Sequence, residues 1–157
     1  MRFLIPLLTA MLLVAPARAA ADLDTATVQA IEAAARDYID GQLDGDAARV
    51  KRGLHPDMAK RAIRPESAEE KFALRRMTTD ELVELTQQGA LKTPREQWDR
   101  TIRILDVAGN IATVRVEAPW FIDHLQLGNF NGRWMVVNAL YYPKPNRPAL
   151  SAAPTQR

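Results

Sequence analysis

The 157-residue chain contains no cysteine and only two histidines. The absence of cysteine excludes disulfide bonds, thiolate zinc sites, iron–sulfur ligation, a cysteine nucleophile and lipoprotein attachment. There is no Gly-rich phosphate loop and no ordered Ser, His and Asp set, so nucleotide binding and acyl transfer receive no support. With so few imidazoles we expect neither a metal site nor a cofactor. The length and the 47% apolar content suit one compact domain.

Long hydrophobic runs are also missing, apart from one near the N-terminus. Residues 3–14 carry no charge, follow Arg2, and precede Pro16 and the sequence Ala17-Arg18-Ala19. This order of positive charge, short apolar core and A-x-A residues is typical of a secretory signal peptide. The run is shorter than the ~20 residues that a transmembrane helix needs. We therefore expect cleavage of residues 1–19, after Ala19 or a neighbouring residue, and a periplasmic protein without a stable membrane anchor.

The folded part lacks an excess of positive charge. The whole chain has 21 Lys and Arg against 19 Asp and Glu, which gives a net charge of +2 and an isoelectric point near 9.1. Five of these cations belong to the signal and to a Pro-rich segment, residues 143–157, which we expect to be a flexible tail. The domain between them, residues 22–142, has 16 basic and 19 acidic side chains. We therefore expect no folded face that gathers Lys and Arg, and no nucleic-acid partner.

Helical periodicity is confined to the first half of the domain. Asp24 is a good N-cap for a first helix, whose apolar residues recur at spacings of three and four. Asp46 caps a short second helix, and the capping box Thr78–Glu81 begins a third. Residues 58–74 are expected to hold one or two short strands. Three helices thus precede most of the predicted sheet.

Strand patterns dominate the second half of the domain. Four strands are predicted, at residues 101–107, 111–118, 120–130 and 133–142. Asn131-Gly132 between the last two is the strongest short hairpin signal in the chain. Helices first and an antiparallel meander last predict an α+β fold.

The Asn131-Gly132 turn also predicts a register, because a two-residue turn pairs Phe130 with Arg133. Continued without interruption, this register pairs Asp123 with Leu140. Paired residues lie on the same face of a sheet. The face that we expect the helices to cover therefore carries Phe121, Asp123, Leu125, Leu127, Trp134, Val136, Asn138, Leu140 and Tyr142.

The opposite face of this hairpin is expected to be half apolar. It carries Trp120, Ile122, His124, Gln126, Arg133, Met135, Val137, Ala139 and Tyr141. Such a mixed surface suits a subunit interface better than open water. We therefore expect a homodimer through the open sheet face, with His124 at the interface or the surface.

Asp123 is the one carboxylate on the face that the helices are expected to cover. A buried carboxylate costs several kcal/mol unless it is neutralised or hydrogen-bonded, so Asp123 is either a pocket residue or a structural acceptor. Tyr38 faces inward from the first helix, and Asn138 is expected nearby. We predict a ligand pocket with Tyr38, Asp123 and Asn138 as its polar residues and Trp134 and Leu125 as its walls.

Several short stretches, in this order, resemble the nuclear-transport-factor-2-like superfamily, and within it the family called "putative lumazine-binding". They are Tyr38-Ile39-Asp40-Gly41, Gly45-Asp46, Leu54-His55-Pro56-Asp57, residues 77–83, Ile104-Leu105-Asp106-Val107, Gly109-Asn110, Gly132-Arg133-Trp134 and Val137-Asn138. The resemblance implies a cone-shaped α+β barrel of three helices on a curved antiparallel sheet. It also implies that the protein binds a small apolar or heterocyclic ligand.

A weaker similarity links the chain to ketosteroid isomerases of the same superfamily. Tyr38 stands eight residues before Asp46, and Ile122-Asp123-His124-Leu125 looks like the strand that carries their oxyanion-hole aspartic acid. By resemblance, Tyr38 and a protonated Asp123 would bind a ligand oxygen. The position of the general base falls at Ala62, however, and without a base no proton can be removed. The similarity therefore does not favour isomerase activity.

The sequence is also consistent with two other interpretations. His55 and Asp57 are the candidate bases if the protein is a lyase, isomerase or cyclase; otherwise they end the second helix and shape the following loop. A dimeric protein-interaction module without a ligand is the third class. In an enzyme, His55 or Asp57 must point into the pocket of Tyr38; in an interaction module, side chains must fill that pocket.

Overall fold

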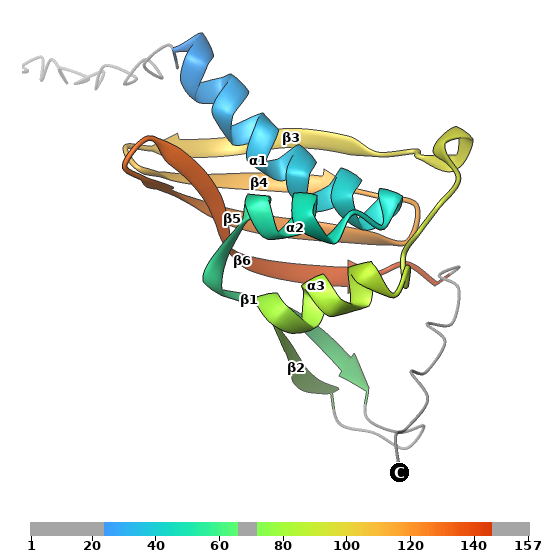
Figure 1. Ribbon diagram of the computed structural model, residues 1–157. Coiled ribbons are helices and arrows are strands. Elements are labelled where there is room, and N and C mark those ends of the chain that lie inside the picture. The colour runs from blue at the N-terminus through green and yellow to red at the C-terminus, as the bar shows by residue number, and fades with distance from the viewer. Residues whose placement is uncertain (1–23, 66–71, 146–157) are drawn as a thin grey trace, which may run out of the picture.

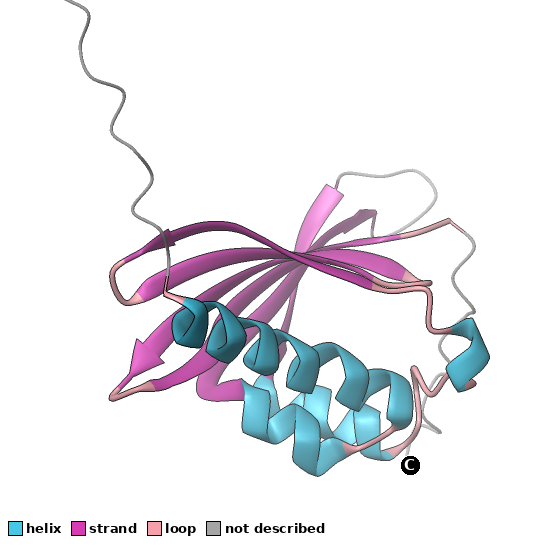
Figure 2. Ribbon diagram, turned by 90° about the horizontal axis from the view of Figure 1, so that it is seen from above, coloured by secondary structure: helices cyan, strands magenta, loops and turns pink. Residues whose placement is uncertain are grey.

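The computed structural model describes residues 24–65 and 72–145, in which helices cover one side of a six-stranded sheet (Figure 1). The helical segments are α1 (Thr25–Asp44), α2 (Ala47–Gly53), α3 (Thr79–Gln87) and the 3-10 turn η1 (Arg95–Gln97). The strands are β1 (Leu54–Pro65), β2 (Phe72–Thr78), β3 (Thr101–Ala108), β4 (Ile111–Glu117), β5 (Phe121–Phe130) and β6 (Arg133–Pro143). Seen from above, the sheet curls over the helices (Figure 2). The predicted α+β cone is confirmed; the predicted signal segment and all of the tail beyond residue 145 lie outside the described residues.

The helices begin at the cap residues that the sequence indicated. Asp24 and Asp46 accept hydrogen bonds from backbone N–H groups in the first turns of α1 and α2. Thr78 and Glu81 form the reciprocal capping box of α3. Gly45 ends α1 with φ of 75°, a left-handed conformation that costs glycine little. Local chemistry therefore determines where each helix starts, and each cap contributes about 1 kcal/mol.

Gly53 lets the end of α2 approach the backbone of α1. A Cβ at this position would lie 2.9 Å from the Ala34 carbonyl oxygen and 3.0 Å from the Tyr38 nitrogen. Real Cβ atoms do not come so close to backbone atoms, so any side chain would push the two helices apart. The glycine therefore helps to place the turn of α1 that carries Tyr38.

The sheet has the strand order β2-β1-β6-β5-β4-β3. All neighbours are antiparallel except β1 and β6, which are parallel. The segment that was expected to hold one or two short strands forms the antiparallel β1–β2 pair, longer than predicted. The core lies between α1 and the inner face of the sheet, and its fully buried side chains include Ile31, Tyr38, Ile39, Val114, Phe121, Leu125 and Leu127.

The β5–β6 hairpin has the predicted turn and an unpredicted bulge. Asn131 and Gly132 have φ of 54° and 88°, as a two-residue hairpin turn with two left-handed positions requires. The pairing then slips by one residue, because Gln126 pairs with Asn138 rather than with Val137. Val137 is therefore an extra residue in β6, and its insertion exchanges the two faces of the strand beyond it.

The bulge overturns part of the predicted register. Asp123 pairs with Tyr141 instead of Leu140, and Leu125 pairs with Ala139 instead of Asn138. Ala139 and Tyr141 thus face the helices, whereas Asn138 faces outward, where its amide donates to Gln126. The prediction that Asn138 shares a pocket with Asp123 is therefore wrong.

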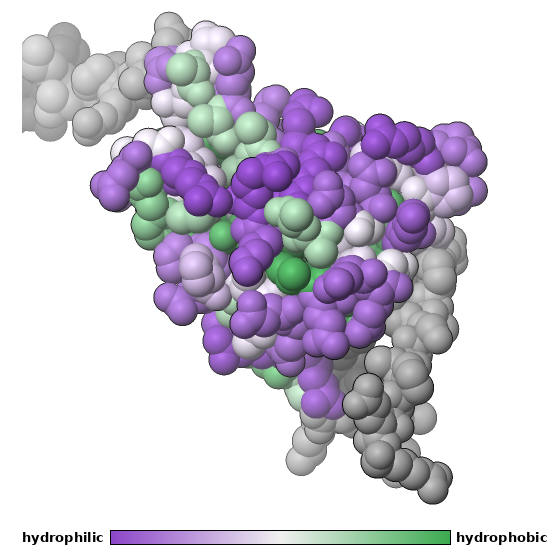
Figure 3. Space-filling view, viewed as in Figure 1, coloured by the Kyte–Doolittle hydropathy of each residue, from purple (hydrophilic) through white to green (hydrophobic). Residues whose placement is uncertain are grey.

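The surface seen from the helix side is mostly hydrophilic, with a small hydrophobic area between α2 and α3 (Figure 3). None of the described helices is both long and apolar enough to cross a membrane.

Candidate functional site

Three buried polar side chains meet between α1 and the sheet. The Tyr38 hydroxyl donates to Asp123 Oδ2 at 2.7 Å, and Lys60 Nζ lies 3.2 Å from the same oxygen. Lys60 Nζ also donates to the Tyr38 oxygen. Tyr38 and Asp123 are fully buried, and Lys60 is only 4% exposed. These three residues, from α1, β1 and β5, are called the buried triad below.

The Lys60 ammonium group of the triad is surrounded by aromatic rings. Its nitrogen lies 4.4 Å from the centroid of Phe121, 4.7 Å from that of Tyr141 and 5.0 Å from that of Tyr38. Ring faces attract a cation, most strongly where water is excluded. The rings and the Asp123 carboxylate together replace the hydration that Lys60 loses on burial.

Asp123 serves as an acceptor in this arrangement. It receives hydrogen bonds from the Tyr38 hydroxyl and from the Lys60 ammonium, which suits an ionised carboxylate. The resemblance to ketosteroid isomerases implied the opposite role, a protonated Asp123 that donates to a ligand. The presence of Lys60 accounts for this difference.

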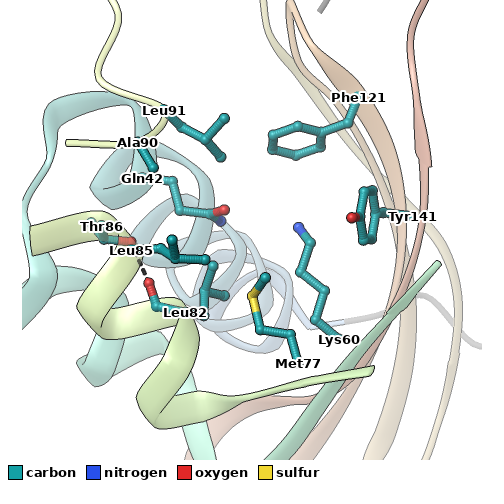
Figure 4. Close-up of a pocket in the computed structure, with 10 residues that line it drawn as sticks. All are labelled: Gln42, Lys60, Met77, Leu82, Leu85, Thr86, Ala90, Leu91, Phe121 and Tyr141. Atoms are coloured by element: carbon teal, nitrogen blue, oxygen red, sulfur yellow. Dashed lines mark hydrogen bonds between the residues drawn. The ribbon is translucent and has the colours of Figure 1, made fainter. Parts of the chain in front are cut away.

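A small cavity of about 40 Å³ adjoins the triad on the Lys60 side. Its walls come from α1, α3, the segment after α3, and the strands β1, β2, β5 and β6 (Figure 4). The lining residues are Gln42, Lys60, Met77, Leu82, Leu85, Thr86, Ala90, Leu91, Phe121 and Tyr141. The cavity is thus largely apolar, with Lys60 and Gln42 projecting toward each other across it (Figure 4).

Gln42 brings an unsatisfied acceptor to this cavity. Its side chain is fully buried, and its Nε2 donates to the Tyr38 carbonyl at 2.8 Å. Its Oε1 has no hydrogen-bond partner among the described residues, and neither has Asp123 Oδ1. A buried acceptor without a donor costs about 1–3 kcal/mol, so such atoms point to a place where a ligand or water binds.

Burial raises the pKa of the Tyr38 phenol well above its usual value near 10, and the neighbouring Asp123 charge raises that pKa further. The phenol is therefore neutral in the folded protein. Because its folded pKa is raised, its contribution to stability is complete below pH 10 and is lost as the pH rises above 10.

We expect the free energy of unfolding to fall more steeply above pH 10 in the parent protein than in Tyr38→Phe, which lacks the titrating group. Urea unfolding between pH 8 and 11 measures this slope for both proteins. Equal slopes would show that Tyr38 ionises as easily in the folded chain as in the unfolded one.

The other predicted pocket residues have different positions. Tyr38 and Asp123 are in direct contact, as a shared site requires. Leu125 and Trp134 are buried in the core beneath the helices, but neither lines the cavity. Asn138 lies on the outer face, bonded to Gln126 and Arg61.

The candidate bases His55 and Asp57 lie away from the cavity. His55 is the second residue of β1, its ring stacks on Phe130 at 4.7 Å between ring centroids, and its Nδ1 accepts a hydrogen bond from the Asp57 backbone N–H. The Asp57 side chain is 94% exposed. Neither residue is part of the cavity lining, and Ala62, at the position of the isomerase base, is fully buried. His124 is exposed on the outer face, as predicted.

Lys60 and Gln42 belong to the site although neither was predicted from the sequence. Lys60 stands beside Arg61, so the pair resembles an exposed basic stretch. The signal that could have found it is the alternation Met58-x-Lys60-x-Ala62, which places Lys60 on the inner face of a strand. Gln42 lies four residues after Tyr38, on the same face of α1.

Among the described residues, no group of three His, Asp or Glu side chains could hold a metal ion.

Comparison with known proteins gives one family. The model of the family described as "Putative lumazine-binding" matches residues 26–142. No matching relative was found among curated proteins.

Several solved structures share the fold. An NTF2-like protein of unknown function from Silicibacter pomeroyi is 21% identical, with a TM-score of 0.57 over 75% of this chain and 96% of that one. An NTF2-like protein from Methylobacillus flagellatus is 19% identical, with a TM-score of 0.58 over 78% and 96%. A ketosteroid isomerase-like protein from Erwinia carotovora is 17% identical, with a TM-score of 0.50 over 76% and 98%. At these identities the similarity shows an NTF2-like fold and nothing finer.

Proposed function

Because the chain belongs to the family described as "Putative lumazine-binding", we propose that it binds a small heterocyclic ligand in the cavity beside the buried triad. The observation that carries this proposal is the unpartnered Gln42 Oε1, buried at the wall of an apolar cavity opposite the Lys60 ammonium. An acceptor and a positive charge that face one cavity suit a ligand edge with an N–H or O–H donor beside a carbonyl oxygen.

The ligand edge that fits best is a lactam, in which an N–H and a C=O are adjacent. Its N–H donates to Gln42 Oε1, while its carbonyl oxygen lies in the positive field of Lys60. Lumazine, the compound in the family's name, carries such edges. Its flat ring system also suits the aromatic walls that Phe121 and Tyr141 provide.

The cavity must widen before a bicyclic ring can enter. An engineered cavity of about 150 Å³ holds a single benzene ring, and this one has about 40 Å³. Met77 at the wall has an unbranched, flexible side chain that can change its conformation at low cost. The polar edge thus enters first, and the rest of the ligand displaces Met77.

Binding is favoured over proton-transfer catalysis at this site. Among the described residues that line the cavity there is no carboxylate and no imidazole. General acid–base catalysis most often uses such a group within hydrogen-bond reach of the substrate, and the lysine that lines the cavity, Lys60, is held in an ion pair with Asp123.

The direct test is a titration with lumazine, followed by its fluorescence. We expect Asp123→Asn to weaken binding about tenfold, because loss of the carboxylate charge releases Lys60 from its position. His124→Ala, on the outer face, serves as the matched control and should leave the affinity unchanged. A larger effect of His124→Ala than of Asp123→Asn would contradict the proposed site.

Gln42→Leu tests the hydrogen bond itself. It should weaken lumazine binding about fivefold, in line with the ~1 kcal/mol that a hydrogen bond contributes. It should not weaken binding of 1,3-dimethyllumazine, which has no N–H on this edge.

Native mass spectrometry of the purified protein, before any ligand is added, identifies a natural ligand by its mass.

A further inference from the structure

The strand register gathers cations in one row across the outer face of the sheet. Arg61 pairs with Arg76, His124 with Arg115, and Arg115 with Arg103. Leu140 of β6 pairs with both Arg61 and His124 and completes the row. The six positions, one per strand from β2 to β3, are Arg76, Arg61, Leu140, His124, Arg115 and Arg103; we call them the arginine row. The expectation that no folded face gathers Lys and Arg is therefore wrong.

The members of the arginine row differ in the partners that they have among the described residues. Arg115 forms an ion pair with Glu117 at 2.7 Å, and Arg61 bonds the Asn138 side chain. Arg76 and Arg103 are exposed and form no ion pair within residues 24–65 and 72–145, although the charge of Arg76 is near enough to Glu81 to lower the pKa of that carboxyl group. Glu117 is itself shared with Lys144, which adds a further cation to this region. The face therefore carries an excess of positive charge.

Like charges stand directly opposite each other at two places in this row, Arg61–Arg76 and Arg115–Arg103. Directly opposed like charges destabilise a pair of strands by up to about 1 kcal/mol each. Glu117 offsets the charge of Arg115, and an anion from outside the described residues would offset the charge that remains in the row.

A row of exposed apolar residues lies beside the arginine row. Leu74 pairs with Ile63, and Tyr142 with Ile122, each two residues along its strand from a member of the arginine row. Leu74, Ile63 and Tyr142 are 62%, 58% and 60% exposed. Residues two apart on a strand share a face, so the apolar and cationic rows form one continuous surface.

We propose that this outer face docks an acidic, aliphatic segment of another protein. The carboxylates of the segment meet the arginine row, and its aliphatic side chains cover Leu74, Ile63 and Tyr142. The four cations of the row are all arginines, whose planar fork binds carboxylates in pairs of hydrogen bonds. Arginine and tyrosine are also enriched at protein interfaces, whereas lysine is depleted. At about 4.8 Å per strand, the row is about 24 Å long, the length of an extended segment of about seven residues.

Other occupants fit this surface less well. A second copy of the chain would bring the same cations against this row, which opposes the homodimer expected from the sequence. A single-stranded nucleic acid offers phosphates, but its bases need aromatic platforms, and Tyr142 is the one aromatic residue among the exposed apolar side chains of this surface. An acidic, aliphatic peptide offers carboxylates to the arginine row and aliphatic side chains to the apolar row.

The test measures binding of a fluorescent decapeptide of alternating Leu and Glu to the full-length protein. A decapeptide of alternating Leu and Lys, which carries the opposite charge, is the control peptide. We expect the Leu-Glu peptide alone to bind, with an affinity that falls at least tenfold in Arg76→Glu/Arg103→Glu. The matched control is Lys51→Glu/Lys92→Glu, which changes the net charge equally at two exposed cations off the sheet, on α2 and after α3. Its affinity should equal that of the parent protein. Leu74→Ser should weaken binding a further few-fold, because it acts on the apolar row.

Several results would overturn the proposal. Equal loss of binding in the two double variants would mean that the affinity depends only on the net charge of the protein, not on the position of the arginines. No binding of the Leu-Glu peptide, or tighter binding of an oligothymidine or of phosphatidylglycerol vesicles, would contradict an acidic protein partner. Sedimentation of a dimer that the Arg76→Glu/Arg103→Glu change dissociates would assign the face to a second copy. Circular dichroism of each variant verifies that the fold is intact.

Discussion

Replacing Lys60 with methionine should lower the free energy of unfolding by about 3–5 kcal/mol. The substitution leaves the fully buried Asp123 carboxylate without its cationic partner. Only the Tyr38 hydroxyl then remains as a side-chain donor to Asp123 among the contacts described above. Urea unfolding at pH 7 gives the difference, and Lys92→Met, at an exposed lysine, should leave the stability within about 0.5 kcal/mol of the parent value.

A double variant separates the ion pair from simple packing. Lys60→Met/Asp123→Leu removes both charges together, so it should recover most of the loss caused by Lys60→Met alone. Buried ion pairs replaced by apolar residues of similar size are often neutral or stabilising. A double variant less stable than Lys60→Met would mean that the residues contribute independently, and the buried triad would not be one unit.

Replacing Phe121 with alanine should cost about 3–5 kcal/mol, the usual range for a buried phenylalanine. Phe121 is 2% exposed, covers the Lys60 ammonium and forms part of the cavity wall. Its removal also enlarges the cavity. We therefore expect benzene to raise the melting temperature of Phe121→Ala and not that of the parent protein.

Phe130→Ala is the matched control for this prediction, because Phe130 is 40% exposed at the hairpin end of β5. It should cost clearly less than Phe121→Ala, and benzene should not stabilise it. If benzene stabilised both variants equally, or neither, the enlarged cavity would not be continuous with the pocket described here.

Local signals in the sequence predicted the helices and the meander well, because short-range chemistry decides those features. The caps Asp24 and Asp46 act within one turn of their helices, and Asn131-Gly132 acts within four residues. The bulge at Val137 could not be predicted from such short-range signals. Val136 and Val137 are both apolar, so alternation cannot tell which of them is the extra residue; the packing of the whole sheet decides it.

The same limit explains the site. Tyr38 and Asp123 could be paired from the sequence because each stands out as a polar group on an apolar face. The alternation around Lys60 could have placed it on the inner face of a strand, but not beside Tyr38 and Asp123, because its contacts lie 22 to 81 positions away in the chain. The arginine row was not predicted for a related reason: each strand contributes at most one of its cations, so the row does not form a run of basic residues in the sequence.

The single parallel pair in the sheet has a consequence for how the chain reaches its native state. β1 lies near the beginning of the domain, but its partner β6 is the last strand to be synthesised, and Ala59 must find Asn138. Contacts of this sequence separation slow folding, because the loop between them must close first. Until residue 143 is available, β1 and β2 can form only a hairpin with an open edge, and Lys60 has neither Asp123 nor Tyr141 beside it. A chain with this topology stays incompletely folded until its synthesis is nearly finished, because the sheet cannot be completed around Lys60 before β6 is present.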